Sequence, residues 1–270
     1  MRPIRFAVPV AAALAVTLSL GATLSIAKPV ASVSPAIKAA VAAPSRTPAN
    51  IARDAARHPA ETLSFFGVTP GQTVVEYSPA GGWYTEILAP LLAAKGTFYG
   101  LQSPGRGFDG LKTKLAADPK TYGKVKLLEW PAQADQIPSG SVDTLLTFRN
   151  VHNMIMQDKA AASFATFFKL VKPGGTLGIV DHRLPESRDT ALEKTSGYLK
   201  VSTVRALAEA AGFEYVGASE INANPRDTAD YPKGVWTLPP TYTLGDVDKA
   251  RYTAIGESDR MTLRFRKPKK

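Results

Sequence analysis

The chain has 270 residues, of which 44% are hydrophobic, and this apolar fraction is ample for a packed core, so wholesale disorder is excluded. It contains no cysteine, which excludes a disulfide scaffold, a thiolate nucleophile, an iron–sulfur cluster and a thiolate zinc site. The formal net charge is +10, but no base-reading motif accompanies it, so nucleic-acid binding is not predicted. Attraction to an anionic membrane surface is the alternative role for this charge.

The first 27 residues have the layout of a secretory signal peptide. Arg2 and Arg5 precede an apolar run from Phe6 to Ala27, and Ser25-Ile26-Ala27 places small residues three positions and one position before a cleavage point. The apolar run is about 20 residues long, enough to span a bilayer, so an uncleaved inner-membrane anchor is the alternative. Both interpretations predict an exported, periplasmic protein.

Residues 28–50 are rich in Ala, Pro, Ser and Val and contain few large apolar side chains. This composition predicts a linker. No internal repeat or further low-complexity stretch divides the rest of the chain, so residues 51–270 are predicted to form one domain.

The predicted domain alternates strand-like and helix-like segments. Short apolar runs predict strands at residues 72–77, 96–101, 124–130, 142–148, 176–180, 213–221 and 261–265. Apolar faces at helical spacing predict helices at residues 83–94, 158–171 and 202–211. Strands that alternate with helices need right-handed crossovers, so we expect a doubly wound α/β fold with a mainly parallel sheet covered on both faces.

Polar residues gather where these strands end. Glu76, Ser78, Gly81 and Gly82 follow the first strand, Gln102 the second, Arg149, Asn150, His152 and Asn153 the fourth, and Asp181, His182 and Arg183 the fifth. Ligands of such sheets bind beyond the carboxyl ends of the strands. The sequence therefore predicts a small-molecule site at this edge.

Several segments together resemble the class I S-adenosylmethionine-dependent methyltransferases. They are VVEYSPAGGWYTEIL, TFRNVHN and LVKPGGTLGIVDH. RHPAETLSFFGVTPG, EINANPRDTADYPKGVWTLPPTY and AIGESDRM resemble more narrowly an exported bacterial group of predicted methyltransferases. The resemblance covers roughly residues 51–268. It implies a Rossmann-like, seven-stranded sheet with the last strand antiparallel, and S-adenosylmethionine as the cofactor.

The resemblance also implies which residues hold the cofactor. The turn from Glu76 to Gly82 would cradle the methionine part. The superfamily turn has an acid followed by glycine at every second position, and those positions here are Ser78, Ala80 and Gly82, so two of the three glycines are replaced. The acid expected at the ribose is replaced by Gln102.

The adenine side of the cofactor falls after the third predicted strand. Gln133 and Asp135 are both candidates there, and their spacing does not separate them. Trp130 could stack on the base, and the alternative is that it is a core aromatic at the end of a strand.

Catalytic groups of this superfamily often follow the fourth strand, where this chain has His152 and Asn150. His152 is predicted as a general base because histidine changes its charge near neutral pH, and Asp181 is the third catalytic candidate. The alternative is that Asn150 and His152 only cap loops through backbone hydrogen bonds. Neighbouring side chains on a strand point to opposite faces, so Asp181 and His182 are not expected to hold one ion, and no metal is predicted.

About 40 residues separate the last two predicted strands, far more than a hairpin needs. This insertion, near residues 222–258, leaves and returns at the ligand edge, so we predict a lid, the alternative being an ordered packing loop. The predicted substrate and lid residues are Arg149, His182, Arg183, Asn222, Asn224, Trp236, Asp259 and Arg260.

Two main functions follow from these features, and a lyase or hydrolase that uses Asp181 and His152 is a third alternative. The first is S-adenosylmethionine-dependent methyl transfer to an unidentified small molecule. The second is a non-enzymatic periplasmic ligand-binding module that keeps the methyltransferase fold, which the altered turn and Gln102 favour.

Overall fold

The computed structural model describes residues 32–269, which belong to one compact unit that runs from Ala31 to Lys270. The predicted signal segment, residues 1–27, lies outside the described residues. Among the helices of the described part, none is both long and apolar enough to cross a membrane.

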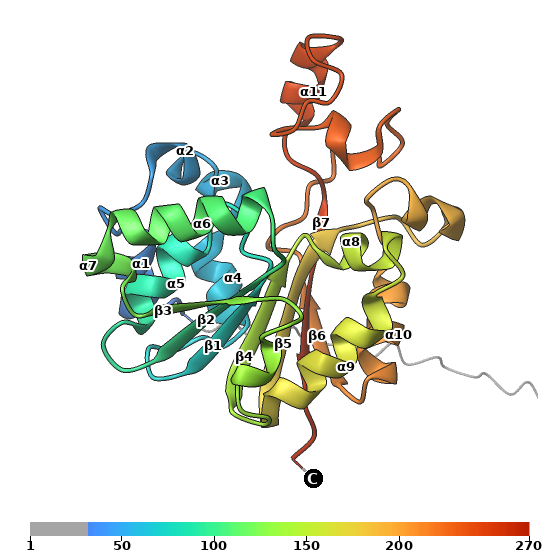
Figure 1. The fold of residues 1–270 in the computed structure, drawn as a ribbon. Helices are drawn as coiled ribbons and strands as arrows, with labels where there is room; N and C mark the ends of the chain where they lie inside the picture. Colours follow the sequence, from blue (N-terminus) through green and yellow to red (C-terminus); the bar gives the residue numbers. More distant parts are fainter. Residues whose placement is uncertain (1–31, 270) are drawn as a thin grey trace, which may run out of the picture. The chain divides into compact units, whose positions relative to one another are not determined.

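The described unit is built on one seven-stranded sheet. Its strands are β1 (Thr73–Tyr77), β2 (Thr97–Gln102), β3 (Val125–Glu129), β4 (Val142–Phe148), β5 (Val171–His182), β6 (Glu214–Ser219) and β7 (Arg260–Arg266). The order is β3-β2-β1-β4-β5-β7-β6, and β7 runs antiparallel to both of its neighbours (Figure 1). The pairs from β3 to β5 are parallel. The predicted doubly wound sheet with an antiparallel last strand is confirmed.

Helices lie on both faces of the sheet (Figure 1). They are α1 (Pro35–Val41), α2 (Pro48–Ile51), α3 (Asp54–Arg57), α4 (Pro59–Phe65), α5 (Thr85–Leu92), α6 (Arg106–Ala117), α7 (Pro119–Tyr122), α8 (Val151–Met156), α9 (Ala160–Leu170), α10 (Val201–Ala210) and α11 (Lys249–Ile255). Short 3₁₀ turns occur at Ala134–Gln136, Thr190–Lys194 and Gly234–Thr237.

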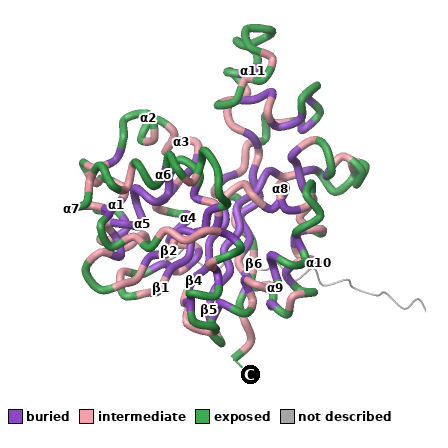
Figure 2. Tube along the Cα trace, viewed as in Figure 1, coloured by how far each residue is buried: buried purple, intermediate pink, exposed green. Residues whose placement is uncertain are grey.

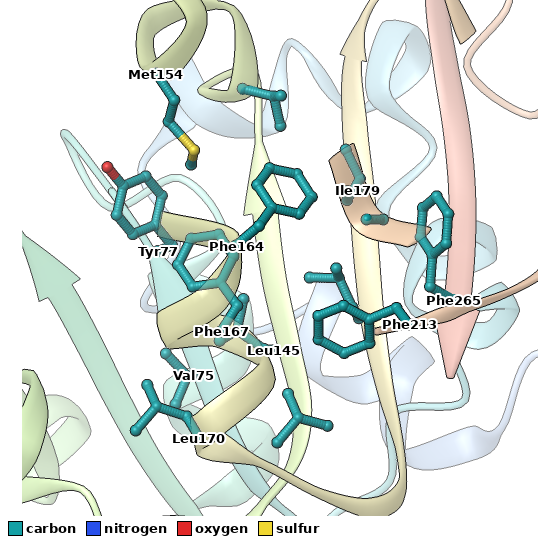
Figure 3. Packing of buried hydrophobic residues seen from close by; sticks show 14 of the residues in the cluster. Val75, Tyr77, Leu145, Met154, Phe164, Phe167, Leu170, Ile179, Phe213 and Phe265 are labelled. Atoms are coloured by element: carbon teal, nitrogen blue, oxygen red, sulfur yellow. The ribbon is translucent and has the colours of Figure 1, made fainter. Parts of the chain in front are cut away.

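The hydrophobic core is divided by the sheet, because successive strand side chains point to opposite faces. Val75 of β1 packs with Phe164 and Phe167 of α9 in one cluster (Figure 3). Val74, its neighbour on the same strand, packs with Leu63 of α4 and other residues in the second cluster. Figure 2 shows the strands buried between these layers, with exposed residues gathered on the outer helices.

The prediction of a linker at residues 28–50 is wrong from Pro35 onward. Helix α1 begins there, and Ser34 caps it by accepting a hydrogen bond from the amide of Ile37 at 3.3 Å. Ile37 and Ala40, one helical turn apart, are buried in the second cluster. An Ala-rich stretch with an apolar residue every third or fourth position forms an amphipathic helix, which the composition alone had concealed.

The insertion between β6 and β7 forms a small folded layer of its own. Tyr231, Val235, Leu238 and Tyr252 pack with residues that follow β5, such as Tyr198, in a third cluster. Helix α11 lies in this insertion, beyond the carboxyl ends of the parallel strands (Figure 1). The insertion is therefore positioned over the edge where the sequence predicts a ligand.

Candidate functional site

A cavity of about 220 Å³ lies beyond the carboxyl ends of β1, β4 and β5, and we call it the strand-end cavity. The sheet side of its wall is formed by Glu76, Ser78, Pro79, Ala80, Trp83, Tyr84, Phe148, Arg149, Asn150, His152, Asn153 and His182. Arg57 of α3 and, from the insertion, Val235, Trp236, Pro239, Pro240, Thr241, Glu257 and Ser258 complete it. Chain segments far apart in the sequence thus meet around one hollow.

The turn after β1 has an alternating backbone. Ser78, Ala80 and Gly82 have φ angles of 56°, 51° and 79°, all in the left-handed region. For a residue with a side chain this conformation costs about 1 kcal/mol or more, which is why glycine is usual at such positions. The turn therefore keeps a glycine conformation at every second residue although two of those residues are not glycine.

Glu76 ends β1 and is only 3% exposed, although it lines the cavity. Its carboxyl accepts a hydrogen bond from Thr85 Oγ1 at 3.0 Å and has no cationic partner in the described part of the chain. Burial raises the pKa of Glu76 to about 8, against a small opposing effect of the Thr85 hydrogen bond. At neutral pH the group is mostly protonated, and a cationic ligand beside it would favour its ionised form.

His152 and Asp181 form a fixed pair. His152 Nδ1 lies 2.8 Å from Asp181 Oδ1, and since a carboxylate only accepts hydrogen bonds, the imidazole proton belongs on Nδ1. Asp181 also accepts from the amides of Val151, His152 and His182 at 2.7, 3.2 and 2.8 Å. The Nε2 lone pair has no protein partner among the described residues, so it is free to accept a proton from a ligand in the cavity.

His182 is the second imidazole of this wall. Its Nδ1 lies 2.5 Å from the hydroxyl oxygen of Ser258, and its ring centroid is 5.2 Å from that of His152. Burial, followed by the positive potential of His152 and Arg149, lowers the pKa of His182 well below its ordinary value. It is therefore a neutral group at neutral pH.

The ligating atoms of His152, Asp181 and His182 all lie within 4.8 Å of one another. The expectation that Asp181 and His182 would face apart is therefore wrong, because the Asp181 carboxylate turns back onto the amide of His182 at the end of β5. Four hydrogen bonds already occupy that carboxylate, and nearby arginines repel a cation. In this cluster His152 is placed to act as a base, and Asp181 holds its ring in position.

No family model matches the chain, and no curated protein matches it. Solved structures do match. An S-adenosylmethionine-dependent methyltransferase from Aquifex aeolicus is 15% identical, with a TM-score of 0.53 over 76% of this chain and 87% of that one. An arsenic(III) S-adenosylmethionine methyltransferase from Chlamydomonas reinhardtii is 16% identical, with a TM-score of 0.52 over 87% of this chain and 73% of that one. The chain has the fold of class I S-adenosylmethionine-dependent methyltransferases.

The [4+2]-cyclase SpnF also matches, with 16% identity and a TM-score of 0.56 over 79% of this chain and 81% of that one. A protein with another described activity is therefore among the neighbours. The methyltransferase fold by itself does not fix the reaction, so function has to be inferred from the site.

The predicted cofactor residues of the β2–β3 side lie outside the strand-end cavity. Gln102 is buried, and its Oε1 accepts a hydrogen bond from the amide of Ala80 at 2.9 Å. Gln133 Oε1 accepts from the amide of Glu129 at 2.9 Å, and Asp135 is exposed on a 3₁₀ turn. Trp130 packs edge-on against Tyr77 at 5.0 Å, as the core-aromatic alternative expected.

Gly81 and Gly82 also lie outside the strand-end cavity, although we expected them to border it. The carbonyl of Gly81 accepts a hydrogen bond from Lys114 Nζ at 3.2 Å. A Cβ on Gly82 would come within 2.9 Å of Leu111 Cδ1, so α6 packs directly on this residue. The cavity is instead bordered by the part of the turn from Ser78 to Ala80.

Asn150 has a mainly structural role. Its Nδ2 donates to the carbonyls of Ser78 at 3.2 Å and Phe148 at 3.0 Å, so it ties the loop after β4 to the turn after β1. Asp181 does not line the cavity and acts through His152. The sequence had grouped all three residues as catalytic, and only His152 presents a free proton-accepting atom.

Most of the predicted lid residues fasten the insertion and do not line the cavity. Arg183 forms two hydrogen bonds with Asp259, at 2.7 and 2.9 Å. Asn222 donates to Thr62 and Thr262, and Asn224 donates to the carbonyls of Ile255 and Glu257. Arg260 is buried against Glu257. Trp236 is the member of the group, besides Arg149 and His182, that lines the cavity.

Sequence reasoning missed two charged residues of the wall, Arg57 and Glu257. Arg57 Nε lies 3.1 Å from Glu257 Oε2, and its guanidinium carbon lies 4.9 Å from the centre of the Trp83 ring. Burial by itself raises the pKa of Glu257, but Arg57, Arg260 and Arg53 lower it to about 2. The sequence signal was a pair of arginines at helical spacing, Arg53 and Arg57, before the first strand.

Proposed function

We propose that the protein transfers a methyl group from S-adenosylmethionine to a small molecule bound in the strand-end cavity. The observation that carries the proposal is the turn after Glu76, whose left-handed residues at positions 78, 80 and 82 keep the backbone conformation of a glycine turn. A conformation that is costly for Ser78 and Ala80 is expected where a ligand needs it. The neighbouring cavity and the His152–Asp181 pair support the same conclusion.

The residues present fit the methionine end of the cofactor. Glu76 can accept from an ammonium group, and the turn brings backbone close to the cavity. The nucleoside end requires Gln102 to exchange its Ala80 partner for a ribose hydroxyl. When bound, S-adenosylmethionine supplies an electrophilic methyl group, which moves to the acceptor's nucleophilic atom as its bond to sulfur breaks.

His152 is the proposed general base. Nε2 takes the proton that the acceptor loses, and Asp181 stabilises the imidazolium through Nδ1. Trp236 and the two prolines of the insertion, Pro239 and Pro240, line the cavity and would limit the access of water to a bound substrate.

The test is a calorimetric titration of the purified chain with S-adenosylmethionine, followed by turnover with candidate acceptors. His152→Ala should lower turnover by about 10²–10⁴-fold, the usual contribution of a general base, while the cofactor affinity stays nearly unchanged. Equal loss of turnover and cofactor affinity would contradict the assignment of His152 as a base.

The non-enzymatic ligand-binding module is the second candidate. One observation favours it: Gln102 and Gln133 accept hydrogen bonds from backbone amides at the place where the nucleoside would lie. If the chain fails to bind S-adenosylmethionine at millimolar concentration but binds a small molecule in the cavity, this candidate replaces the first.

We also propose that the protein acts after export to the periplasm. Arg2, Arg5 and the apolar run that follows support this. Amino-terminal sequencing of the protein from its native cell envelope should find Lys28 or a residue close to it. An intact Met1 in a soluble cytoplasmic pool would contradict export.

A further inference from the structure

Positive charge is concentrated behind the strand-end cavity. Arg53, Arg57 and Arg260 all contact one carboxylate, that of Glu257, at 2.8, 3.1 and 3.0 Å. Arg149 lies nearby, and its guanidinium has no hydrogen bond or ion pair within the described residues. One carboxylate therefore serves more arginines than it can neutralise.

Two of these arginines reach the cavity wall with unused donors. Arg57 is 4% exposed, and its Nη2 is buried without a hydrogen-bond partner in the described part of the chain. Arg149 is held in place by its backbone, with a φ of 61° and an amide that donates to the carbonyl of Val180 at 2.7 Å. A left-handed arginine in the lining of a cavity, with its donors free, is arranged for a ligand.

The other titratable groups in and behind the wall do not supply the missing negative charge. Glu76 is mostly protonated at neutral pH, and Asp181 is occupied by His152 and three amides. His182 is neutral. Burial lowers the pKa of Arg57 to about 9 and that of Arg149 to about 10, and other arginines add to both effects. An anion between the two guanidinium groups would relieve this repulsion.

The cavity lining also contains apolar groups. Val235, Trp236, Pro239 and Pro240 of the insertion present apolar surface to the cavity. Trp83, Tyr84 and Phe148 add aromatic surface on the sheet side, with the ring centroids of Tyr84 and Phe148 stacked at 3.6 Å. A ligand that satisfies both kinds of lining carries a negative group and a flat apolar body.

We infer that the methyl acceptor is a small aromatic or branched carboxylic acid that carries a hydroxyl or amino group. Its carboxylate binds between Arg57 and Arg149, and its hydroxyl or amino group takes the methyl group and loses its proton to His152. This inference rests on the proposed function, because it names the substrate class of the same cavity. Guanidinium groups bind carboxylates with paired hydrogen bonds, which fix the orientation of the acid. Arg149 and His152 both line the cavity, so an acid held by Arg149 lies in the same hollow as the base.

A carboxylate could also come from the cofactor, whose methionine part carries one. Both sources share the same chemistry, and the experiment separates them. The probe is benzoate, with benzamide as the neutral control of the same shape and inorganic phosphate as an anion with no apolar body. Trp83 and Trp236 line the cavity, so tryptophan fluorescence and calorimetry both report binding.

We expect benzoate to bind the full chain at least tenfold more tightly than benzamide or phosphate. Arg149→Gln should weaken the binding of benzoate at least tenfold. Arg106 is an exposed arginine at the start of α6, and Arg106→Gln should leave the affinity for benzoate unchanged. Arg149→Gln removes an unpaired charge and should not lower the unfolding temperature, and benzoate should raise that temperature in the parent chain but not in the variant.

The outcomes distinguish this inference from the proposed function. Benzoate binding to a chain already saturated with S-adenosylhomocysteine supports an acid site for the acceptor. Mutually exclusive binding, together with weaker S-adenosylhomocysteine binding by Arg149→Gln, would assign the arginines to the cofactor and overturn the inference. Benzoate binding without any S-adenosylhomocysteine binding would keep the acid site and remove the methyltransferase. No benzoate binding at millimolar concentration would overturn the acid site itself.

Discussion

The carboxyl edge of the sheet has two halves with opposite character. Beyond β1, β4 and β5 lies a hollow whose polar groups are left with unused capacity, such as His152 Nε2 and Arg57 Nη2. Beyond β2 and β3 the polar groups bond to the chain's own backbone, as Gln102 does with Ala80 and Gln133 with Glu129. Polar residues at strand ends are thus not equivalent, and unused hydrogen-bonding capacity is what marks the ligand side.

A hydrogen bond connects the two halves. Ala80 lines the open half through its position in the turn, and its amide donates to Gln102 of the closed half. Opening the closed half for a nucleoside would therefore release one hydrogen bond of the turn. Substitutions at Asp181, Glu76, Gln102 and Ala80 test whether the two halves differ in this way. Their expected effects on stability or affinity decrease from the first residue to the last.

Asp181→Ala should have the largest effect, because it removes the anchor of the open half. The amides of Val151, His152 and His182 would lose their acceptor in a fully buried position, and His152 would lose its orientation. We expect the free energy of unfolding to fall by about 4 kcal/mol or more, measured by urea denaturation.

Asp158→Ala is the matched control, since Asp158 has an 82% exposed side chain. It should change stability by less than about 1 kcal/mol. Similar losses for both variants would mean that Asp181 is not the anchor of this half.

Glu76→Gln should stabilise the folded chain and weaken the binding of the cofactor. Between about pH 4.5 and pH 8 the folded chain keeps a proton on Glu76 that the unfolded chain has released, so the free energy of unfolding falls as the pH rises. The variant removes this loss of stability and should be more stable than the parent by about 4 kcal/mol at pH 8, with no difference at about pH 4. Denaturant titrations at both values measure it.

The same substitution should weaken the binding of S-adenosylmethionine at least tenfold. A glutamine side chain cannot ionise, so it cannot form an ion pair with the ammonium group of the cofactor. Glu214→Gln, an exposed residue of β6, is the control for both measurements. A Glu76→Gln variant that binds as tightly as the parent would show that this carboxyl is not a cofactor ligand.

Gln102→Glu tests the closed half. A carboxylate at this position can still accept from the amide of Ala80, and it binds a ribose diol more strongly because its hydrogen bonds are charge-assisted. We expect S-adenosylmethionine to bind roughly three- to tenfold more tightly, equivalent to about 1 kcal/mol, by calorimetry. Gln133→Glu is the comparison, and unchanged affinity in both variants would favour the ligand-binding module.

Much of the fold could be predicted from the sequence. The runs QTVVEY and VDTLLTF are rich in residues that fill a buried strand, and they became β1 and β4 almost residue for residue. Helix α6 was missed because its glycines and lysines leave only Leu111 buried. Strand β5 begins at Val171 rather than Thr176, since Val171 already pairs with Val142 and the Pro-Gly-Gly segment forms an irregularity within the strand.

The site was less predictable because it depends on contacts between distant segments. Arg57 and Glu257 are 200 residues apart and meet only after the insertion folds over α3. Gln102 was placed at the right strand end, but no sequence pattern says that its amide would turn toward Ala80 rather than a ligand. The sequence therefore predicted that a ligand would bind at the carboxyl edge of the sheet. Side-chain packing determines which half of that edge contains the cavity.

Ala80→Gly should have the smallest effect on stability. It tests whether the Ala80 methyl group or the surrounding fold determines the conformation of the turn. Ala80 is exposed with a φ of 51°, so removing its Cβ costs no buried surface and relieves a left-handed strain of about 1 kcal/mol. The unfolded chain gains freedom worth nearly the same amount, so the free energy of unfolding should change by less than about 0.5 kcal/mol.

Gly82→Ala is the opposing case, because φ is 79° and the new Cβ would lie 2.9 Å from Leu111. Denaturant titration should show a loss of at least about 1 kcal/mol for this variant. If Ala80→Gly destabilises as much as Gly82→Ala, the Ala80 methyl group itself shapes the turn. A neutral Ala80→Gly with unchanged cofactor affinity would mean instead that the surrounding fold, through Gln102 and the Leu101 carbonyl that accepts from Ser78, imposes the turn on whichever residue stands there.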